Sequence, residues 1–206
     1  TTSQPAPPQL SPISGLEYPK KQWLAGHGYA LSLLLKAEES IVPFDANRQS
    51  FLQQQIDWAT QTPWPLGIRL LTGQGGTGKT RLGLELCQQL ANQGWQMGFL
   101  PGKTTQPALN GIAAQLSNLA SQGTACCVVV DYAETQQEAL LFLLGEWLKQ
   151  PQPAGRIRFL LLARDGGEWW SQIPHQQPAC ESLLLGEATS GPYVIPSLHH
   201  DITTRL

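Results

Sequence analysis

From residue 68 to residue 163, hydrophobic residues alternate between short, mainly apolar runs and spaced repeats. Apolar runs occupy residues 68–71, 95–100, 125–130 and 157–163. Short runs of this kind are typical of strands that are covered on both faces of a parallel sheet. The stretches between them repeat apolar residues every third or fourth position, which predicts helices. Because strands alternate with helices, we expect an α/β fold, a doubly wound parallel sheet with flanking helices.

The first two helices predicted between these runs each show one apolar face. Leu82, Leu86 and Leu90 recur every fourth residue, and Gly94 stands where a left-handed helix terminator is expected. A further repeat runs over residues 109–120. These stretches predict helices that pack against the sheet.

A capping signal marks the third predicted helix. Thr135 and Glu138 match the T-x-x-E pattern of a capping box ahead of an apolar repeat that reaches Leu148. Pro151 and Pro153 follow and would end the helix.

The chain outside this core is less regular. Helical spacing predicts a helix near 29–39 and another at about 48–60, behind the polar residue Asn47. The chain begins at Thr1 without an initiator methionine, so we expect a piece of a longer protein. Four regions are predicted: a Pro-rich linker or arm (1–15), a helical segment leading into the site (16–62), the core (63–170), and an irregular extension that starts a truncated following region (171–206).

Composition and charge limit the expected partners. The chain has 13 basic and 15 acidic residues, so no positive excess indicates a nucleic-acid partner. No apolar run approaches the roughly 18 residues of a membrane helix, and we expect no membrane partner. The four cysteines form no C-x-x-C pair, which favours a reducing, cytoplasmic location.

The glycine-rich segment after the first predicted strand matches the phosphate-binding loop G-x-x-x-x-G-K-[ST]. Small residues allow successive backbone N–H groups to turn inward around a phosphate, and the following helix directs its positive end there. The alternative is a tight turn that merely uses glycines, which accounts for neither Lys79 nor Thr80. The predicted nucleotide-binding residues here are Gly73, Gln74, Gly75, Gly76, Thr77, Gly78, Lys79 and Thr80.

A magnesium nucleotide also needs a carboxylate on a neighbouring strand. The run VVVD supplies one at Asp131, so we expect Thr80 and Asp131 to hold Mg²⁺. The alternative is that Asp131 only caps the end of its strand or the following turn.

Two further residues are candidates for the chemistry. Glu134 lies three residues beyond Asp131, where a carboxylate could polarise an attacking water, or it could equally be a solvated residue before a helix. Arg164 follows the fourth predicted strand and is favoured as a sensor of the γ-phosphate over an ion pair with Asp165 or Glu168. Arg158, at the other end of that strand, is predicted to be a surface charge.

Four segments in order resemble the nucleotide-binding domain of bacterial STAND NTPases, which are multidomain signal-transduction ATPases of the P-loop NTPase fold. The resemblance spans roughly residues 41–170. It rests on VPFDANRQSFLQQQIDW, RLLTGQGGTGKTRLGLELC, VVVDYAE and RIRFLLLARDGGEWW.

The resemblance implies further site residues. In that family the segment before the loop packs near the adenine, which implies nucleotide binding by Phe44 and Arg48, with Val42 and Pro43 alongside. Many members place a second acidic residue after the strand aspartate, where this chain has Tyr132. Hydrolysis is therefore expected to be slow, or Glu134 substitutes.

The resemblance also implies a function. We expect a switch module that binds ATP or ADP with Mg²⁺ and hydrolyses the γ-phosphate at low turnover to control oligomerisation and signalling. The partners expected for such a module are the nucleotide and either further copies of the chain or other domains of a longer chain. A small-molecule kinase and a motor or loader subunit of the AAA+ class remain as alternatives.

Overall fold

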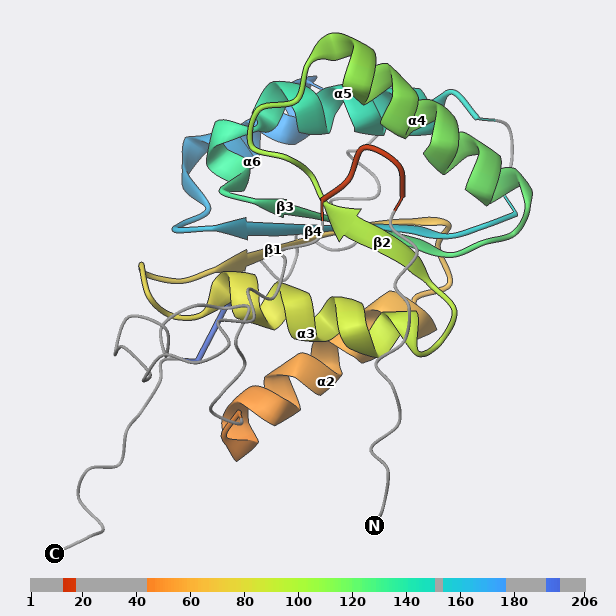
Figure 1. Ribbon diagram of the computed structural model, residues 1–206. Helices are drawn as coiled ribbons and strands as arrows, with labels where there is room; N and C mark the ends of the chain where they lie inside the picture. The colour runs from red at the N-terminus through yellow and green to blue at the C-terminus, as the bar shows by residue number, and fades with distance from the viewer. Residues whose placement is uncertain (1–12, 18–43, 151–153, 177–191, 197–206) are drawn as a thin grey trace, which may run out of the picture.

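A parallel sheet with strand order β2-β3-β4-β1-β5 forms the centre of the computed structural model (Figure 1). The structure describes residues 13–17, 44–150, 154–176 and 192–196. The strands are β1 (Leu66–Thr72), β2 (Gln96–Phe99), β3 (Cys126–Asp131), β4 (Ile157–Ala163) and β5 (Tyr193–Val194). All four pairings between neighbouring strands are parallel, as the alternation of strands and helices predicts.

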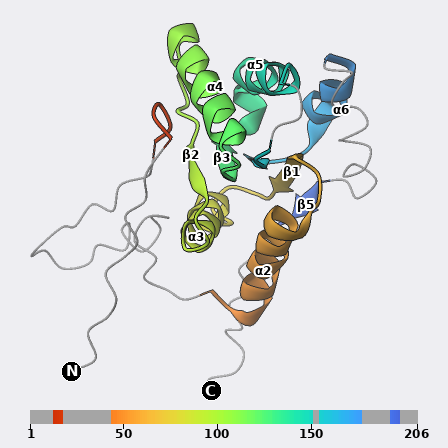
Figure 2. The ribbon, with the colours of Figure 1, turned by 90° about the vertical axis from the view of Figure 1, so that its right-hand side faces the viewer.

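Helices cover both faces of this sheet. Two lie on one face and three on the other, so the prediction of a doubly wound α/β fold is confirmed (Figures 1 and 2). The first face carries α2 (Ala46–Gln61) and α3 (Lys79–Ala91); the second carries α4 (Gln106–Ser121), α5 (Gln137–Leu148) and α6 (Gly167–Gln176). No helix within the described ranges is long and apolar enough to cross a membrane. The helix expected near 29–39 lies outside the described residues.

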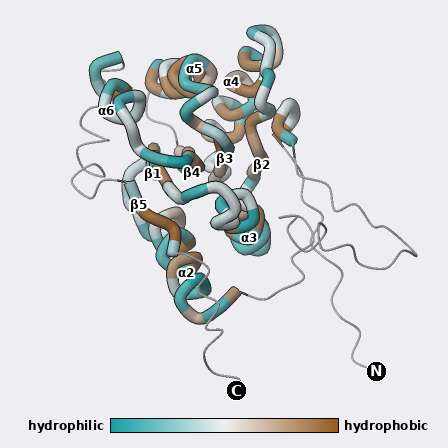
Figure 3. The backbone as a smooth tube through the Cα atoms, turned by 90° about the vertical axis from the view of Figure 1, so that its left-hand side faces the viewer, coloured by the Kyte–Doolittle hydropathy of each residue, from teal (hydrophilic) through white to brown (hydrophobic). Residues whose placement is uncertain are grey.

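The apolar run of β3 is unbroken because each face of the sheet has its own core. Val128 and Val130 pack with residues of α4 and α5, whereas Cys127 and Val129 pack with α2 and α3. Successive strand residues point to opposite faces, so a strand between two helical layers needs apolar residues at every position. Unlike β3, helices α4 and α5 alternate between hydrophobic and hydrophilic residues along their length (Figure 3).

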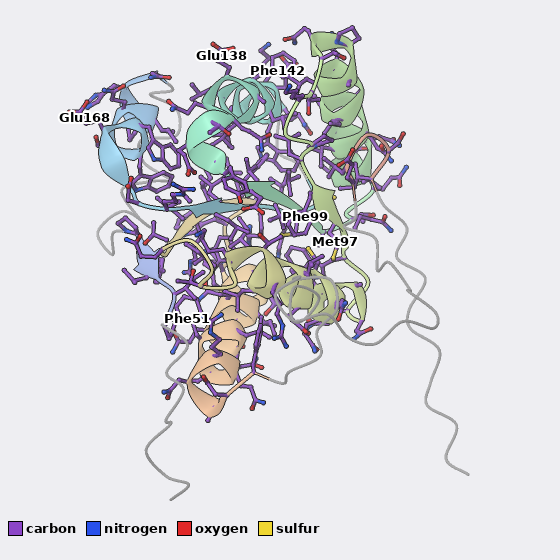
Figure 4. All side chains as sticks on the ribbon, turned by 60° about the vertical axis from the view of Figure 1, so that its left-hand side comes forward. Phe51, Met97, Phe99, Glu138, Phe142 and Glu168 are labelled. Atoms are coloured by element: carbon purple, nitrogen blue, oxygen red, sulfur yellow. The ribbon has the colours of Figure 1, made fainter. Side chains whose placement is uncertain are left out.

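The capping box expected at the start of α5 is wrong. Thr135 ends a short 3-10 helix, η1 (Ala133–Thr135), and both its backbone N–H and its hydroxyl donate to the Tyr132 carbonyl, each at 2.8 Å. The residue that caps α5 is Gln136, which makes no side-chain capping bond. Glu138 points away from the sheet rather than back along the chain (Figure 4). The Thr135 hydroxyl, which a capping box would need, is therefore used in the turn after β3.

The expectation that Arg158 is a surface charge is also wrong. Its side chain is fully buried under the end of α2 and donates to the carbonyls of Ala59 (3.0 Å), Thr62 (2.9 Å) and Trp64 (3.0 Å). Carbonyls at the end of a helix lack partners inside it and carry partial negative charge, so a guanidinium satisfies them well. Gly67 leaves the necessary room, because a Cβ there would lie 2.8 Å from Arg158 Cδ.

The chain before the core packs against the edge strand β2. Glu17 and Phe99 exchange two backbone hydrogen bonds of 2.8 Å as an antiparallel bridge. Ile13 and Leu16 are buried in the core shared with α4 and α5. Residues 1–12 of the predicted linker lie outside the described residues, but its last residues belong to this packed turn.

Replacement of Arg158 tests its role in holding α2. Arg158→Met removes the buried guanidinium that donates to the carbonyls of Ala59, Thr62 and Trp64, and we expect the free energy of unfolding to fall by about 3 kcal/mol. Arg156→Met removes an exposed arginine that donates to the Thr60 carbonyl and should change the free energy of unfolding by less than about 0.5 kcal/mol. Urea unfolding followed by tryptophan fluorescence measures both, and equal stability of the two variants would contradict this assignment.

Candidate functional site

Three strands end at the same level at the carboxyl edge of the sheet. Thr72 of β1 pairs with Ala163 of β4, and Asp131 of β3 pairs with Leu162 of β4. The chain leaves β1 towards α3 on one face and β4 towards α6 on the other face (Figure 1). Ligands of open α/β sheets bind at such a switch point, beyond the carboxyl ends of the strands.

The loop between β1 and α3 takes a conformation that only glycine adopts readily. Gly76 and Gly78 have φ values of 80° and 79°, in the left-handed region. The backbone N–H and hydroxyl of Thr77 donate to the Gln74 carbonyl at 3.2 and 2.9 Å, which closes the turn. A Cβ on Gly73 would lie 2.7 Å from Thr77 Oγ1, so the loop folds tightly on itself.

The mouth of this loop carries positive charge. Helix α3 begins at Lys79 behind Gly78, with no side-chain cap on its first N–H groups. Lys79 Nζ donates to the carbonyls of Gly73 (2.6 Å) and Gln74 (3.1 Å) and so lies across the loop. An uncapped helix N-terminus beside an ammonium group suits a phosphate.

Three candidate residues influence the pKa of Lys79 through their charges. Burial lowers the pKa of Lys79 below its ordinary value, while the carboxylates of Asp131 and Glu134 raise this pKa and Arg164 lowers it. The charges of Asp131, Glu134 and Arg164, which come from different loops, therefore all act on the ammonium group of Lys79.

Thr80 and Asp131 form the most direct contact in the site. The Thr80 hydroxyl donates to Asp131 Oδ2 at 2.6 Å, although the two residues are 51 positions apart. Asp131 Oδ1 accepts the Tyr132 N–H (3.0 Å), so Asp131 also caps the turn after its strand. One hydroxyl and one carboxylate oxygen, with phosphate oxygens and water, suit the ligand preferences of Mg²⁺. Within the described part of the chain, no group of three His, Cys, Asp or Glu residues offers another metal site.

Glu134 faces the same space with an unsatisfied oxygen. Its side chain is half-buried, and Oε2 is buried without a hydrogen-bond partner in the described structure. Glu134 also lines a cavity of about 490 Å³ between the approach to α4 and the start of α5. The cavity is mostly polar; its lining includes Lys103, Gln106, Gln136 and Glu138. A carboxylate oxygen without a hydrogen-bond partner is free to accept a proton from a bound molecule.

Arg164 is exposed at the end of β4. Its effect on the pKa of Lys79 shows that its charge acts on the loop. In the described ranges it forms no ion pair with Asp165 or Glu168, which was the alternative interpretation.

Arg48 lies behind the loop and Phe44 lies beside it. Arg48 is 1% exposed, and its Nη2 donates to the carbonyls of Thr77 and of Pro196 (2.8 Å). The Phe44 ring contacts the guanidinium of Arg81 at 4.4 Å and that of Arg48 at 5.9 Å. A second cavity of about 420 Å³ opens between α2 and α3; its lining includes Phe44, Gln49, Arg81, Glu85 and Gln89. Val42 and Pro43 lie outside the described residues.

Several residues of the site carried no usable signal in the sequence. Gln136 Nε2 donates to the Asp131 carbonyl at 2.7 Å and so fixes the turn that presents the carboxylate. Tyr132 has a φ of 54°, which is uncommon for a residue with a side chain and is typical of functional turns. Arg81 and Pro196 contribute through contacts with residues distant in the chain. The positive φ of Tyr132 and the use of the Pro196 carbonyl as an acceptor are properties of the backbone, so no pattern of residue types in the sequence indicates them.

Comparisons with known proteins add little to this geometry. No model of a known protein family matches the chain, and no curated protein does. The chain is similar to the solved structure of the ORC1 protein of Aeropyrum pernix in complex with DNA, with 15% identity and a TM-score of 0.47. The match covers 75% of this chain and 46% of that chain, so the chain spans less than half the length of that protein.

This comparison corrects one expectation. The near balance of charge led us to expect no nucleic-acid partner, yet the similar structure is that of a protein bound to DNA.

Gly78→Ala tests the strained geometry of the loop. We expect a loss of about 1–2 kcal/mol in the free energy of unfolding, because alanine is strained at a positive φ and its Cβ would lie 3.0 Å from Arg48 Nη1. Gly75→Ala is the control, since a Cβ there meets nothing within 4 Å. Thermal unfolding measures both variants; equal losses would show that the backbone at Gly78 is not constrained.

Proposed function

We propose that the chain binds a magnesium nucleoside triphosphate at Gly73–Thr80 and slowly hydrolyses its γ-phosphate. The observation that carries this proposal is the 2.6 Å hydrogen bond between Thr80 and Asp131. A glycine turn alone would need neither a hydroxyl on the following helix nor a carboxylate from another strand. Together with Lys79, the pair offers the donors that a diphosphate and its metal ion need.

The reaction assigns a role to each polar side chain. A water oxygen forms a bond to the γ-phosphorus while the bond from phosphorus to the bridging oxygen breaks, and Glu134 accepts the proton of the water. The charge that moves onto the bridging and terminal oxygens is stabilised by Lys79 and Arg164. Mg²⁺ held by Thr80 and Asp131 supplies further charge neutralisation when bound. The products are the diphosphate and inorganic phosphate.

The nucleoside end fits the side of the loop where α2 and α3 meet. We place the base beside the first turn of α3, next to Arg81, because that turn directly follows the phosphate loop. The cavity there offers an aromatic face at Phe44 and polar groups at Gln49, Glu85 and Gln89, which a purine could stack on and hydrogen-bond to. This supports adenine near Phe44, as the resemblance implies.

The finer proposal is a regulatory switch of the STAND type that binds ATP or ADP and controls oligomerisation and signalling. Its support is the order of the four resembling segments between residues 41 and 170. Tyr132 stands where such proteins often have a second acidic residue, and its phenol side chain supplies no second carboxylate. Glu134 is then the base, and we propose a low turnover suited to a timer.

The cavity beside Glu134 favours a second candidate function. Its volume of about 490 Å³ would hold a small polar molecule with a hydroxyl near the γ-phosphate. Transfer of the phosphoryl group to that hydroxyl would make the protein a kinase. Release of inorganic phosphate without any acceptor favours the hydrolase, whereas ATP consumption that requires an acceptor favours the kinase.

Lys79→Ala tests nucleotide binding. The variant loses the ammonium that contacts the β- and γ-oxygens, so we expect affinity for Mg-ATP and Mg-ADP to fall by about 100-fold or more, with an unchanged circular dichroism spectrum. Lys149→Ala removes an exposed lysine paired with Glu146 on α5 and is the control. Calorimetry measures both; unchanged affinity in Lys79→Ala would refute the proposed function.

Arg164→Ala tests the sensing of the γ-phosphate. We expect affinity for a non-hydrolysable ATP analogue to fall by about tenfold and affinity for ADP to change little, because only the triphosphate reaches this side chain. Arg156→Ala, which alters an exposed arginine at the opposite end of β4, should change neither. Equal losses for both nucleotides would count against this role.

A further inference from the structure

Arg48 joins two segments that are far apart in the sequence. A single nitrogen, Nη2, donates to the carbonyl of Thr77 in the phosphate loop and to that of Pro196 just after β5. The side chain is 1% exposed, so water competes little for either hydrogen bond. The resemblance implies nucleotide binding by this arginine; in the structure Nη2 donates to these two carbonyls, and Nε is buried without a hydrogen-bond partner among the described residues.

The position of Arg48 is itself tightly fixed. Its backbone N–H donates to Asp45 Oδ1 at 2.8 Å, where Asp45 caps α2. On the other side, Nη1 lies against Gly78, where a Cβ would come within 3.0 Å. The guanidinium therefore has little freedom to follow a displaced carbonyl. A movement of Thr77 must either break the hydrogen bond from Arg48 Nη2 to the Thr77 carbonyl or shift the Pro196 carbonyl, which accepts from the same nitrogen.

The β5 segment is attached to the rest of the domain mainly through β1 and the core on the α2 and α3 face, where Ile195 is 2% exposed. β5 pairs with β1 over two residues, and the Ile195 N–H donates to the Thr72 carbonyl at 2.8 Å. Tyr193 also contacts the guanidinium of Arg69 at 4.2 Å. Figure 2 shows β5 at the edge of the sheet beside β1. Among these attachments, the Arg48 hydrogen bond is the one that includes the phosphate loop. Since β5 pairs over two residues at the edge of the sheet, its pairing depends on such side-chain contacts.

We propose that Arg48 is a positioning residue that couples the phosphate loop to the docking of β5. The proposal rests on the proposed function, because it requires a phosphate in the loop. Phosphate binding orders the N–H groups around Thr77 and fixes its carbonyl, which fixes Arg48 and in turn Pro196. Coupling between two sites is reciprocal, so docking of β5 also raises nucleotide affinity.

Amide hydrogen exchange at Ile195, with and without saturating Mg-ADP, tests the coupling. In the unaltered chain we expect nucleotide to slow this exchange by about fivefold or more. Arg48→Met removes both hydrogen bonds donated by Nη2 at similar side-chain volume. This variant should show no slowing of exchange at Ile195 even when it is saturated with nucleotide. Arg48→Lys keeps the charge without the planar guanidinium and should show a smaller response than arginine.

The matched control is Arg158→Met, which removes the other buried arginine that binds carbonyls of the α2 region, at the opposite end of the helix. A general loss of packing would affect this variant too, but the proposal requires it to keep the response at Ile195. Arg156→Met provides the same control in a milder form, since Arg156 is exposed and donates to the Thr60 carbonyl.

Three results would overturn the proposal. A response in Arg48→Met equal to that of the unaltered chain would do so, as would Mg-ADP binding to the unaltered chain without a change at Ile195. If Arg48→Met does not fold, a full response in Arg48→Lys would have the same effect. Calorimetry on the same samples separates the two proposals, because absence of nucleotide binding in the unaltered chain refutes the proposed function as well.

Discussion

The register of three neighbouring strands is the constraint on which the candidate site depends. Pairing of β4 with both β1 and β3 sets Thr72, Ala163 and Asp131 at one level, so the chains that leave these strands start from a common edge. A slip of one residue in β3 would exchange its two faces and move Asp131 out of reach of Thr80. Every position of β3 before Asp131 is buried in one of the two cores. A slip would therefore require both cores to repack, which opposes it. Packing that carries no chemistry therefore holds the 2.6 Å contact between Thr80 and Asp131.

Helix α2 connects this edge to the opposite end of the sheet. Its N-terminal turn provides Arg48 behind the phosphate loop, and its C-terminal carbonyls receive Arg158 from β4. Both arginines donate to backbone carbonyl oxygens, which satisfies buried guanidinium groups with neutral acceptors. Desolvation by burial lowers the pKa of Arg48, Asp45 raises it and Arg81 lowers it, yet arginine remains charged at neutral pH. Helix α2 is thus held at both ends by buried guanidinium groups.

The parts of the molecule that the sequence predicts well are those with local patterns. The loop, the four longer strands and the apolar faces of their helices are read from residues within one turn or one strand, and Asp131 follows from the apolar run before it. The wrong predictions concern partners distant in the chain. Arg158 resembles a surface charge until α2 is placed over it, and Thr135 resembles a cap until Tyr132 takes a positive φ. Side-chain contacts to backbone carbonyls have no sequence signature, since every residue has a carbonyl.

The bridge between Glu17 and Phe99 affects how copies of this domain can meet. An edge strand with free N–H and C=O groups is a template for pairing with another chain and for aggregation. Here the residues before the core occupy the backbone groups of Phe99, and Gly98 admits the Leu16 side chain, since a Cβ there would lie 2.6 Å from Leu16 Cβ. Continuation of the sheet into a second molecule through β2 would first require displacement of this turn. Assembly of such modules, where it occurs, is thereby directed towards helices and loops rather than towards this margin of the sheet.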